Sequence, residues 1–147
     1  MTLYYLSIFI ITEIIKMNTK LDKILAEISA GELIDKITIL EIKKNKIIDE
    51  DKLKEVQKEL SSLTQTLDKF IPKKDGIMGY KQNLKEINLK LWEIEDGKRK
   101  AEKDKDFGQN FIELARNVYK FNDERAKIKL AINNSLGSNI KEVKSYD

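Results

Sequence analysis

The stretch LKEVQKELSSLTQTLDKF, residues 53–70, carries the clearest helical pattern in this chain of 147 residues. Its apolar residues recur three and four positions apart, which places them on one face of an α-helix. The positions are Leu53, Val56, Leu60, Leu63, Leu67 and Phe70. Pro72 follows and cannot continue a helix, because it lacks a backbone N–H. The pattern predicts a structural helix with an apolar, coiled-coil-like seam that ends before Pro72.

A second helix is predicted immediately before this one. Ser29 with Glu32 three residues later forms a capping-box pattern, so this helix should begin at Ala30. Apolar residues fall on two of its faces, with Leu33, Ile34, Ile37, Leu40 and Ile48 on one and Ile39 and Ile42 on the other. We expect a central helix that pairs antiparallel with the 53–70 helix through a short turn at residues 49–51.

A third helix is predicted after Pro72. Residues 73–79 contain two glycines and are expected to form a loop. The helix should then run from about Tyr80 to about Glu102, and Gly97 weakens its second half. Its apolar stripe is formed by Leu84, Ile87, Leu91 and Ile94.

A fourth helix completes the predicted fold. Asp106 with Gln109 forms a second capping-box pattern, and Gly137 is a plausible C-terminal cap. The apolar stripe between them comprises Phe111, Leu114, Val118, Phe121, Ile132 and Leu136. Four helices joined in this order predict an all-α antiparallel helical bundle built from two long helical hairpins.

Composition limits the chemistry that the chain can support. The 28 basic and 25 acidic residues are interspersed, so no basic stripe of the kind that nucleic acid requires is present. The chain has no Cys and no His, which removes disulfides, thiolate metal sites and the usual imidazole base. We therefore expect no nucleic-acid partner, and we assign no metal site and no cofactor to the chain.

The length of the chain suits one domain, and we divide it into three parts. Residues 1–16 form an apolar extension that is too short for the roughly 20 residues of a membrane-spanning helix. Three interpretations remain open for it: a true start at Met17, a short helix docked on the body, or a membrane-surface anchor. Residues 17–137 are predicted to form a single helical domain, and residues 138–147 a loosely packed polar tail. We expect a cytoplasmic protein without a transmembrane segment.

Polar residues interrupt the apolar faces of three predicted helices and locate a candidate site. Burying such groups costs several kcal/mol unless each finds a partner, so we expect them to form one network or to line one solvated pocket. Arg125 should take a carboxylate in a bidentate pair, with two asparagines satisfying the remaining groups. The candidate residues are Glu41, Lys44, Asn88, Glu95, Asn122, Arg125 and Lys129, and either Glu41 or Glu95 could supply the carboxylate.

Three interpretations of this polar centre stay open. It could be a buried network that fixes helix register. It could be an anion pocket like that of chorismate mutase, although the arginine expected near the start of the first helix is missing. Paired acids, Glu93 with Asp96 and Glu32 with Asp35, could instead hold magnesium, as in helical nucleotide pyrophosphohydrolases. Against that, Glu93 and Asp96 fall on the side opposite the apolar stripe. No catalytic residue can be assigned.

Two stretches resemble a bacterial family known only as a domain of unknown function. They are GELIDKITILEIK at residues 31–43, and LWEIED with FIELARNVYKFNDERAKIKLAIN within residues 91–133. The likeness extends to KSY at residues 144–146, whereas the helix at 53–70 and the first sixteen residues lie outside the matching motifs. The resemblance implies a loose association with bacterial carbohydrate transfer, but no activity and no site residue.

These observations favour a non-enzymatic binding or assembly module. A lone layer of four helices would leave Ile39, Ile42 and Leu89 exposed, so we expect a homodimer. A protein partner or a small anionic ligand would fit the polar centre. The alternative is a small enzyme, without a cofactor or dependent on magnesium, that acts on an anionic metabolite.

Overall fold

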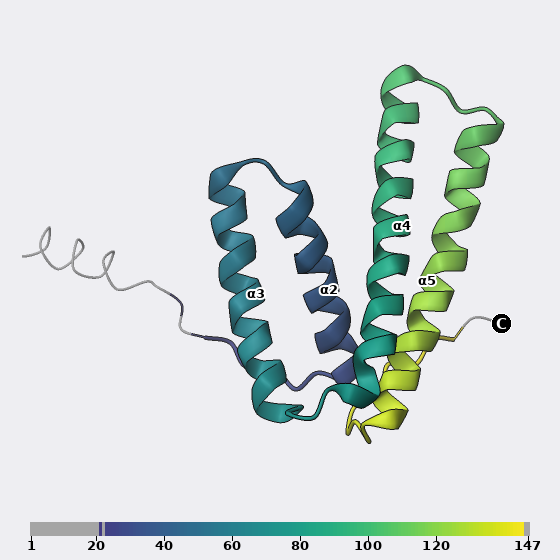
Figure 1. Cartoon of the computed structure of the whole chain (residues 1–147). Helices are drawn as coiled ribbons and strands as arrows, with labels where there is room; N and C mark the ends of the chain where they lie inside the picture. The colour runs from purple at the N-terminus through teal and green to yellow at the C-terminus, as the bar shows by residue number, and fades with distance from the viewer. Residues whose placement is uncertain (1–20, 22, 146–147) are drawn as a thin grey trace, which may run out of the picture.

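The computed structural model describes residues 21 and 23–145, in which all regular secondary structure is helical and residues 23–29 and 138–145 form neither helix nor strand. The elements are α2 (Ala30–Lys46), α3 (Glu50–Phe70), a 3₁₀ turn η1 (Asp75–Ile77), α4 (Met78–Asp104) and α5 (Gln109–Ser135) (Figure 1). The predicted all-α fold is confirmed. The N-terminal extension at residues 1–16 lies outside the described residues.

The four helices form two hairpins that meet at one end and diverge toward the other (Figure 1). One hairpin pairs α2 with α3, and the other pairs α4 with α5. Helix α2 also packs against both α4 and α5, whereas α3 packs mainly against α2. Helix α2 therefore holds the central position predicted for it, and α3 is an edge helix.

The main hydrophobic core lies at the converging end of the hairpins. All four helices and η1 contribute buried side chains to it: Leu33, Ile34, Ile37, Leu67, Ile77, Leu84 and Ile132. Leu67 comes from the apolar seam of α3, so that seam faces α2 and the core as its spacing predicts. Where the hairpins begin to separate, the buried polar residues Asp35, Thr38 and Asn88 lie between α2 and α4.

We call the first turn of α2, residues 30–32, its sealed end, because side chains from two parts of the chain accept hydrogen bonds from its backbone N–H groups. Ser29 Oγ accepts a hydrogen bond of 3.1 Å from the Glu32 backbone N–H, which confirms Ser29 as the N-cap. The backbone N–H of Ala30 donates to Ser138 Oγ at 3.1 Å, and that of Gly31 donates to Asn133 Oδ1 at 2.7 Å. The free N–H groups at a helix start, which need partners when buried, are thus satisfied here.

Gly31 allows α2 to approach α5 at this end. A Cβ atom at this position would lie 2.5 Å from the Lys129 carbonyl oxygen and 3.0 Å from Asn133 Oδ1. Gly97 plays a similar part higher in the structure, since a Cβ there would lie 3.1 Å from Leu114 Cδ1. Helix α4 runs without interruption through Gly97, because close packing on α5 outweighs the low helical propensity of glycine.

The predicted capping box at Asp106 and Gln109 is wrong. Lys105 adopts a left-handed conformation with φ of 57°, and the Asp106 N–H donates to the Ala101 carbonyl at 2.9 Å, which closes the end of α4. Asp106 Oδ1 then accepts from the Gly108 N–H at 3.1 Å, and Gly108 is the N-cap of α5. The aspartate bonds to the backbone two residues ahead, so its side chain shapes the turn and does not cap the helix.

Two other boundaries test the sequence predictions. The predicted loop at 73–79 is too long, because η1 and the first turn of α4 occupy its second half. Ile77 is 2% exposed, so burial in the core fixes this segment. Leu136 is the C-cap of α5, and Gly137 follows it in the left-handed conformation with a φ of 62°, so the predicted glycine lies one residue beyond the cap.

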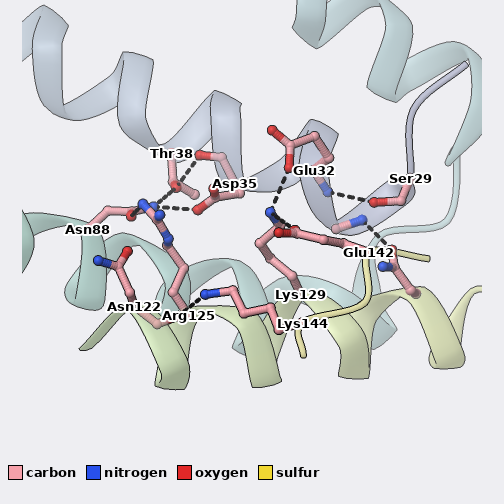
Figure 2. Close-up of polar contacts among 12 residues, drawn as sticks. Ser29, Glu32, Asp35, Thr38, Asn88, Asn122, Arg125, Lys129, Glu142 and Lys144 are labelled. Atoms are coloured by element: carbon pink, nitrogen blue, oxygen red, sulfur yellow. Dashed lines mark hydrogen bonds and ion pairs between the residues drawn. The ribbon is translucent and has the colours of Figure 1, made fainter. Parts of the chain in front are cut away.

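The tail after Gly137 lies back along α5 (Figures 1 and 2). Glu142 Oε2 accepts a hydrogen bond from Lys129 Nζ, and Lys144 Nζ donates to the Asn122 carbonyl. These polar contacts connect the tail to α5, and the side chains of residues 139–145 are exposed, so the loose packing predicted for the tail stays a prediction. Among the described helices, none combines the length and the apolar character that crossing a bilayer requires.

Candidate functional site

A buried carboxyl group lies at the centre of the polar site. Asp35, on α2, is 4% exposed, and its Oδ1 accepts a hydrogen bond of 2.7 Å from Asn88 Nδ2 on α4 (Figure 2). Asn88 Nδ2 also donates to Thr38 Oγ1 at 2.9 Å, and the Thr38 hydroxyl donates to the Asp35 carbonyl at 2.7 Å. Both protons of the Asn88 amide are thus used, which fixes its orientation.

Arg125 joins this network from α5. Its Nη1 donates to Asn88 Oδ1 at 3.3 Å, so a chain of hydrogen bonds runs from Asp35 through Asn88 to Arg125 and links three helices (Figure 2). Burial raises the pKa of Asp35 above its usual value, and the hydrogen bond from Asn88 and the charges of Arg125 and Lys129 offset only part of this rise. The centre is therefore a buried acid beside an arginine.

A second cluster lies one helical turn further along α5. Lys129 Nζ donates to Glu32 Oε2 at 2.6 Å and to Glu142 Oε2 at 2.5 Å, which connects α5 to both α2 and the tail (Figure 2). Burial alone would lower the pKa of Lys129, but these two bonds outweigh it and hold the pKa above its usual value. The same contact with Lys129 lowers the pKa of Glu142.

The structure brings together only some of the predicted site residues. Asn88 and Arg125 are in direct contact, and Lys129 lies next to them on α5. Lys44 is exposed and borders a separate shallow groove against α3. Asn122 contributes its backbone carbonyl to the tail contact with Lys144.

The predicted pairing of Arg125 with Glu41 or Glu95 is wrong. Glu41 is bound by Lys81 Nζ at 2.7 Å and Lys85 Nζ at 2.9 Å, both from α4. Burial would raise the pKa of Glu41, but these two bonds hold it below its usual value. Glu95 pairs with Lys98 of its own helix at 3.0 Å. Arg125 lies level with Asp35 and Thr38, about one turn earlier along α2 than Glu41.

Asp35 and Thr38 were missed as site residues by the sequence analysis, which weighed Asp35 only as a magnesium ligand. A signal for them exists: Gly31, Asp35, Thr38 and Ile42 recur four, three and four positions apart, and all four are buried. This stripe is not uniformly apolar, so a search for hydrophobic periodicity passes over it.

An open groove lies where the two hairpins begin to diverge. It has a volume of about 470 Å³ and is lined by residues from three helices. Helix α2 contributes Ile39 and Lys43, α5 contributes Arg125, and α4 contributes Asn88, Leu91, Trp92, Glu95, Asp96 and Arg99. The hydrogen-bond chain from Asp35 therefore ends at an arginine that lines this groove.

The charges around the groove are not balanced. Within residues 23–145, no ion pair engages Lys43, Arg99 or Arg125, whereas Glu95 is already paired with Lys98. Asp96 is the remaining carboxylate in the lining. The groove thus presents an excess of positive charge, which favours an anionic occupant.

The acids weighed for a magnesium site do not gather in the described part of the chain. Glu93 and Asp96 are both exposed on α4, and Glu32 is bound by Lys129. No group of three or more carboxylates placed to hold a metal ion occurs among the residues that the structure describes.

The comparisons with known proteins identify a family. No curated protein and no solved structure matches the chain. A family model does match, over residues 24–147, and it is described as a family of unknown function, DUF6165. This match includes all four described long helices, the polar centre and the groove. The chain therefore belongs to the DUF6165 family of unknown function.

Proposed function

We propose that the protein is a non-enzymatic binding module that holds a small anionic ligand in the groove between its hairpins. One observation carries the proposal: Lys43, Arg99 and Arg125, from three different helices, line one groove of about 470 Å³ without ion-pair partners among the described residues. An anion placed there would neutralise charges that the fold itself leaves unpaired.

Arg125 is the residue best placed to bind the anion. A guanidinium group has five N–H donors, and the hydrogen bond to Asn88 uses one of them. Asn88 is itself held by Asp35 and Thr38, so the arginine is positioned before a ligand arrives. Its other donors could take a carboxylate or phosphate group in a bidentate pair.

The groove also offers an apolar wall. Ile39, Leu91 and Trp92 lie beside the cationic residues and are each partly buried. Pockets of this kind bind ligands through an apolar surface and a few fixed polar groups. We therefore expect a ligand in which the anionic group is joined to an apolar or planar part that packs on Trp92.

The enzymatic alternative has one observation in its favour. Asp35 is a buried carboxyl group with a raised pKa, and such groups are frequent at catalytic centres. Its Oδ1 is, however, engaged by Asn88, and the residue is 4% exposed. A binding role requires of Asp35 only that it helps to position Arg125 through Asn88, which the observed hydrogen bonds already do.

Fluorescence of Trp92 tests the proposal, since it is the only tryptophan in the chain and lines the groove. The full chain is titrated separately with inorganic pyrophosphate and with citrate as anionic probes. We expect a saturable change with at least one probe. Arg125→Leu should abolish it, whereas Arg116→Leu, an exposed arginine on the same helix, should leave it unchanged.

Two further measurements decide the result. Thermal unfolding of Arg125→Leu must remain cooperative, so that lost binding is not lost folding. Native mass spectrometry of the gently purified protein should show an added mass that Arg125→Leu removes. The proposal fails if no probe changes the fluorescence and no added mass is present, or if Arg125→Leu binds as the wild type does.

The homodimer stays a prediction. Within the single chain Ile42 is 5% exposed, whereas Ile39 and Leu89 are only partly buried. The native mass spectrum reports the assembly state at the same time as the ligand.

A further inference from the structure

A buried carboxyl group and a groove-lining arginine belong to one chain of hydrogen bonds. Asn88 connects them: its Nδ2 donates to Asp35 Oδ1 at 2.7 Å, and its Oδ1 accepts from Arg125 Nη1 at 3.3 Å (Figure 2). The charge of Arg125 also acts on Asp35 through space and lowers the pKa of that carboxyl. Arg125 therefore interacts with a negative charge of the protein itself before a ligand is present.

Other charged groups surround Asp35, and most of them are paired with each other. They are Glu32, Lys36 and Lys43 of α2, Glu59 of α3, and Arg125 and Lys129 of α5, while α4 presents the uncharged amide of Asn88. Lys36 pairs with Glu59 at 2.8 Å. Lys129 pairs with Glu32 at 2.6 Å. Within residues 23–145, Arg125 and Lys43 are thus the cations near Asp35 that no ion pair engages, and both line the groove between the hairpins.

The surroundings of Asp35 favour its neutral form and still leave it a route to solvent. Burial raises the pKa of this carboxyl by more than the nearby cations and the hydrogen bond lower it. Asp35 lines a hollow of about 310 Å³ between α2 and α3, which shares Ile39 and Lys43 with the groove between the hairpins. Asp35 can therefore exchange a proton with solvent close to the place where an anion would bind.

We propose that Asp35 couples anion binding in the groove to protonation, so that the anion binds more tightly when the Asp35 carboxyl is neutral. This inference rests on the proposed function, because the anion is the one that Arg125 holds. An ionised Asp35 attracts Arg125 and repels the anion, whereas a neutral Asp35 does neither. A neutral carboxyl still has a carbonyl oxygen that accepts from Asn88, so Arg125 stays in position. By linkage, binding of the anion raises the pKa of Asp35 further.

Sulfate tests this inference, because its double negative charge does not change over the pH range used. The full chain is titrated with sodium sulfate at about pH 4.5 and about pH 7.5 at constant ionic strength, and Trp92 fluorescence gives the dissociation constant. We expect this constant to be lower at the acidic pH by about fivefold or more. Asp35→Asn cannot ionise, and it should reduce the difference to about twofold or less.

Asp96→Asn is the matched control, because Asp96 also lines the groove but is exposed on α4. This variant should keep the pH dependence of the wild type. Equal dissociation constants at the two pH values, or the same pH dependence in Asp35→Asn as in the wild type, overturns the inference and leaves the proposed function standing. Absence of sulfate binding at both pH values also overturns the inference, and the pyrophosphate and citrate titrations then decide the proposed function.

Discussion

The two ends of α2 differ in their surroundings: one is closely packed and fully hydrogen-bonded, and the other borders an open, cationic groove. At its N-terminal end the N–H groups of Ala30, Gly31 and Glu32 have side-chain acceptors, and Gly31 leaves no room for a side chain. At the other end Lys43 borders an open groove with two arginines that lack ion-pair partners among the described residues. The comparison shows that one helix can fix the fold with one end and present charge with the other.

The largest effect is expected at the sealed end. Gly31→Val would place a side chain against the Lys129 carbonyl, 2.5 Å from the new Cβ, and backbone there cannot move without separating α2 from α5. We expect the free energy of unfolding to fall by about 3 kcal/mol or more, measured by urea denaturation.

Gly79→Ala is the control for this substitution, because a Cβ on Gly79 in α4 meets no atom within 4 Å. It should leave stability unchanged or raise it slightly, since alanine favours helix. Equal stabilities for Gly31→Val and the wild type would show that the contact between α2 and α5 is not tight.

A smaller loss is expected from Asn133→Ala. Asn133 is 1% exposed, and its Oδ1 is the acceptor for the Gly31 N–H. Removing it leaves a buried donor unpaired, which should cost about 1–3 kcal/mol in urea denaturation. Asn134→Ala, at the exposed neighbouring position, serves as the control and should change stability by less than about 0.5 kcal/mol. If Asn133→Ala lowers the free energy of unfolding no more than Asn134→Ala does, the hydrogen bond from Gly31 to Asn133 does not stabilise the sealed end.

The smallest effect concerns Asp35, between the two ends, and it depends on pH. Because the pKa of Asp35 is raised above 3.8 in the folded protein, its protonated form favours folding at low pH, and this contribution is lost as pH rises through the folded-state pKa. Asp35→Asn removes the titration. The stability of this variant relative to the wild type should therefore be higher at about pH 7 than at about pH 3. Urea denaturation at the two pH values checks the sign, and an opposite trend would contradict the raised pKa.

Local signals predicted the fold well. The seam from Leu53 to Leu67 and the N-cap at Ser29 depend on residues close together in sequence, and the structure confirms them. Phe70, at the end of the predicted seam, is instead 69% exposed, and Gly137 lies one residue beyond the C-cap of α5. Asp106 was predicted wrongly because two local bonding patterns compete for the same side chain, and the left-handed Lys105 decides between them.

The candidate site was harder to predict, because it depends on how helices lie against each other. Periodicity shows the face on which Glu41 or Arg125 lies, but not the level at which that face meets its neighbour. Lys81 and Lys85, one turn apart on α4, reach Glu41, and Arg125 lies closer to Asp35. Asn88 and Arg125 were predicted as site residues, and their contact is the part of the proposed network that the structure contains.

The sealed end of α2 has a consequence for how the chain folds during synthesis. The Gly31 N–H and its acceptor on Asn133 are 102 residues apart, and the acceptor for Ala30 is Ser138. Helix α2 leaves the ribosome well before α5, since domains emerge from the N-terminus at about 5–20 residues per second. For several seconds at such rates, the N–H groups of Ala30 and Gly31 therefore lack their acceptors on Ser138 and Asn133. The hairpin of α2 and α3 reaches its final stability only when residue 138 has been made.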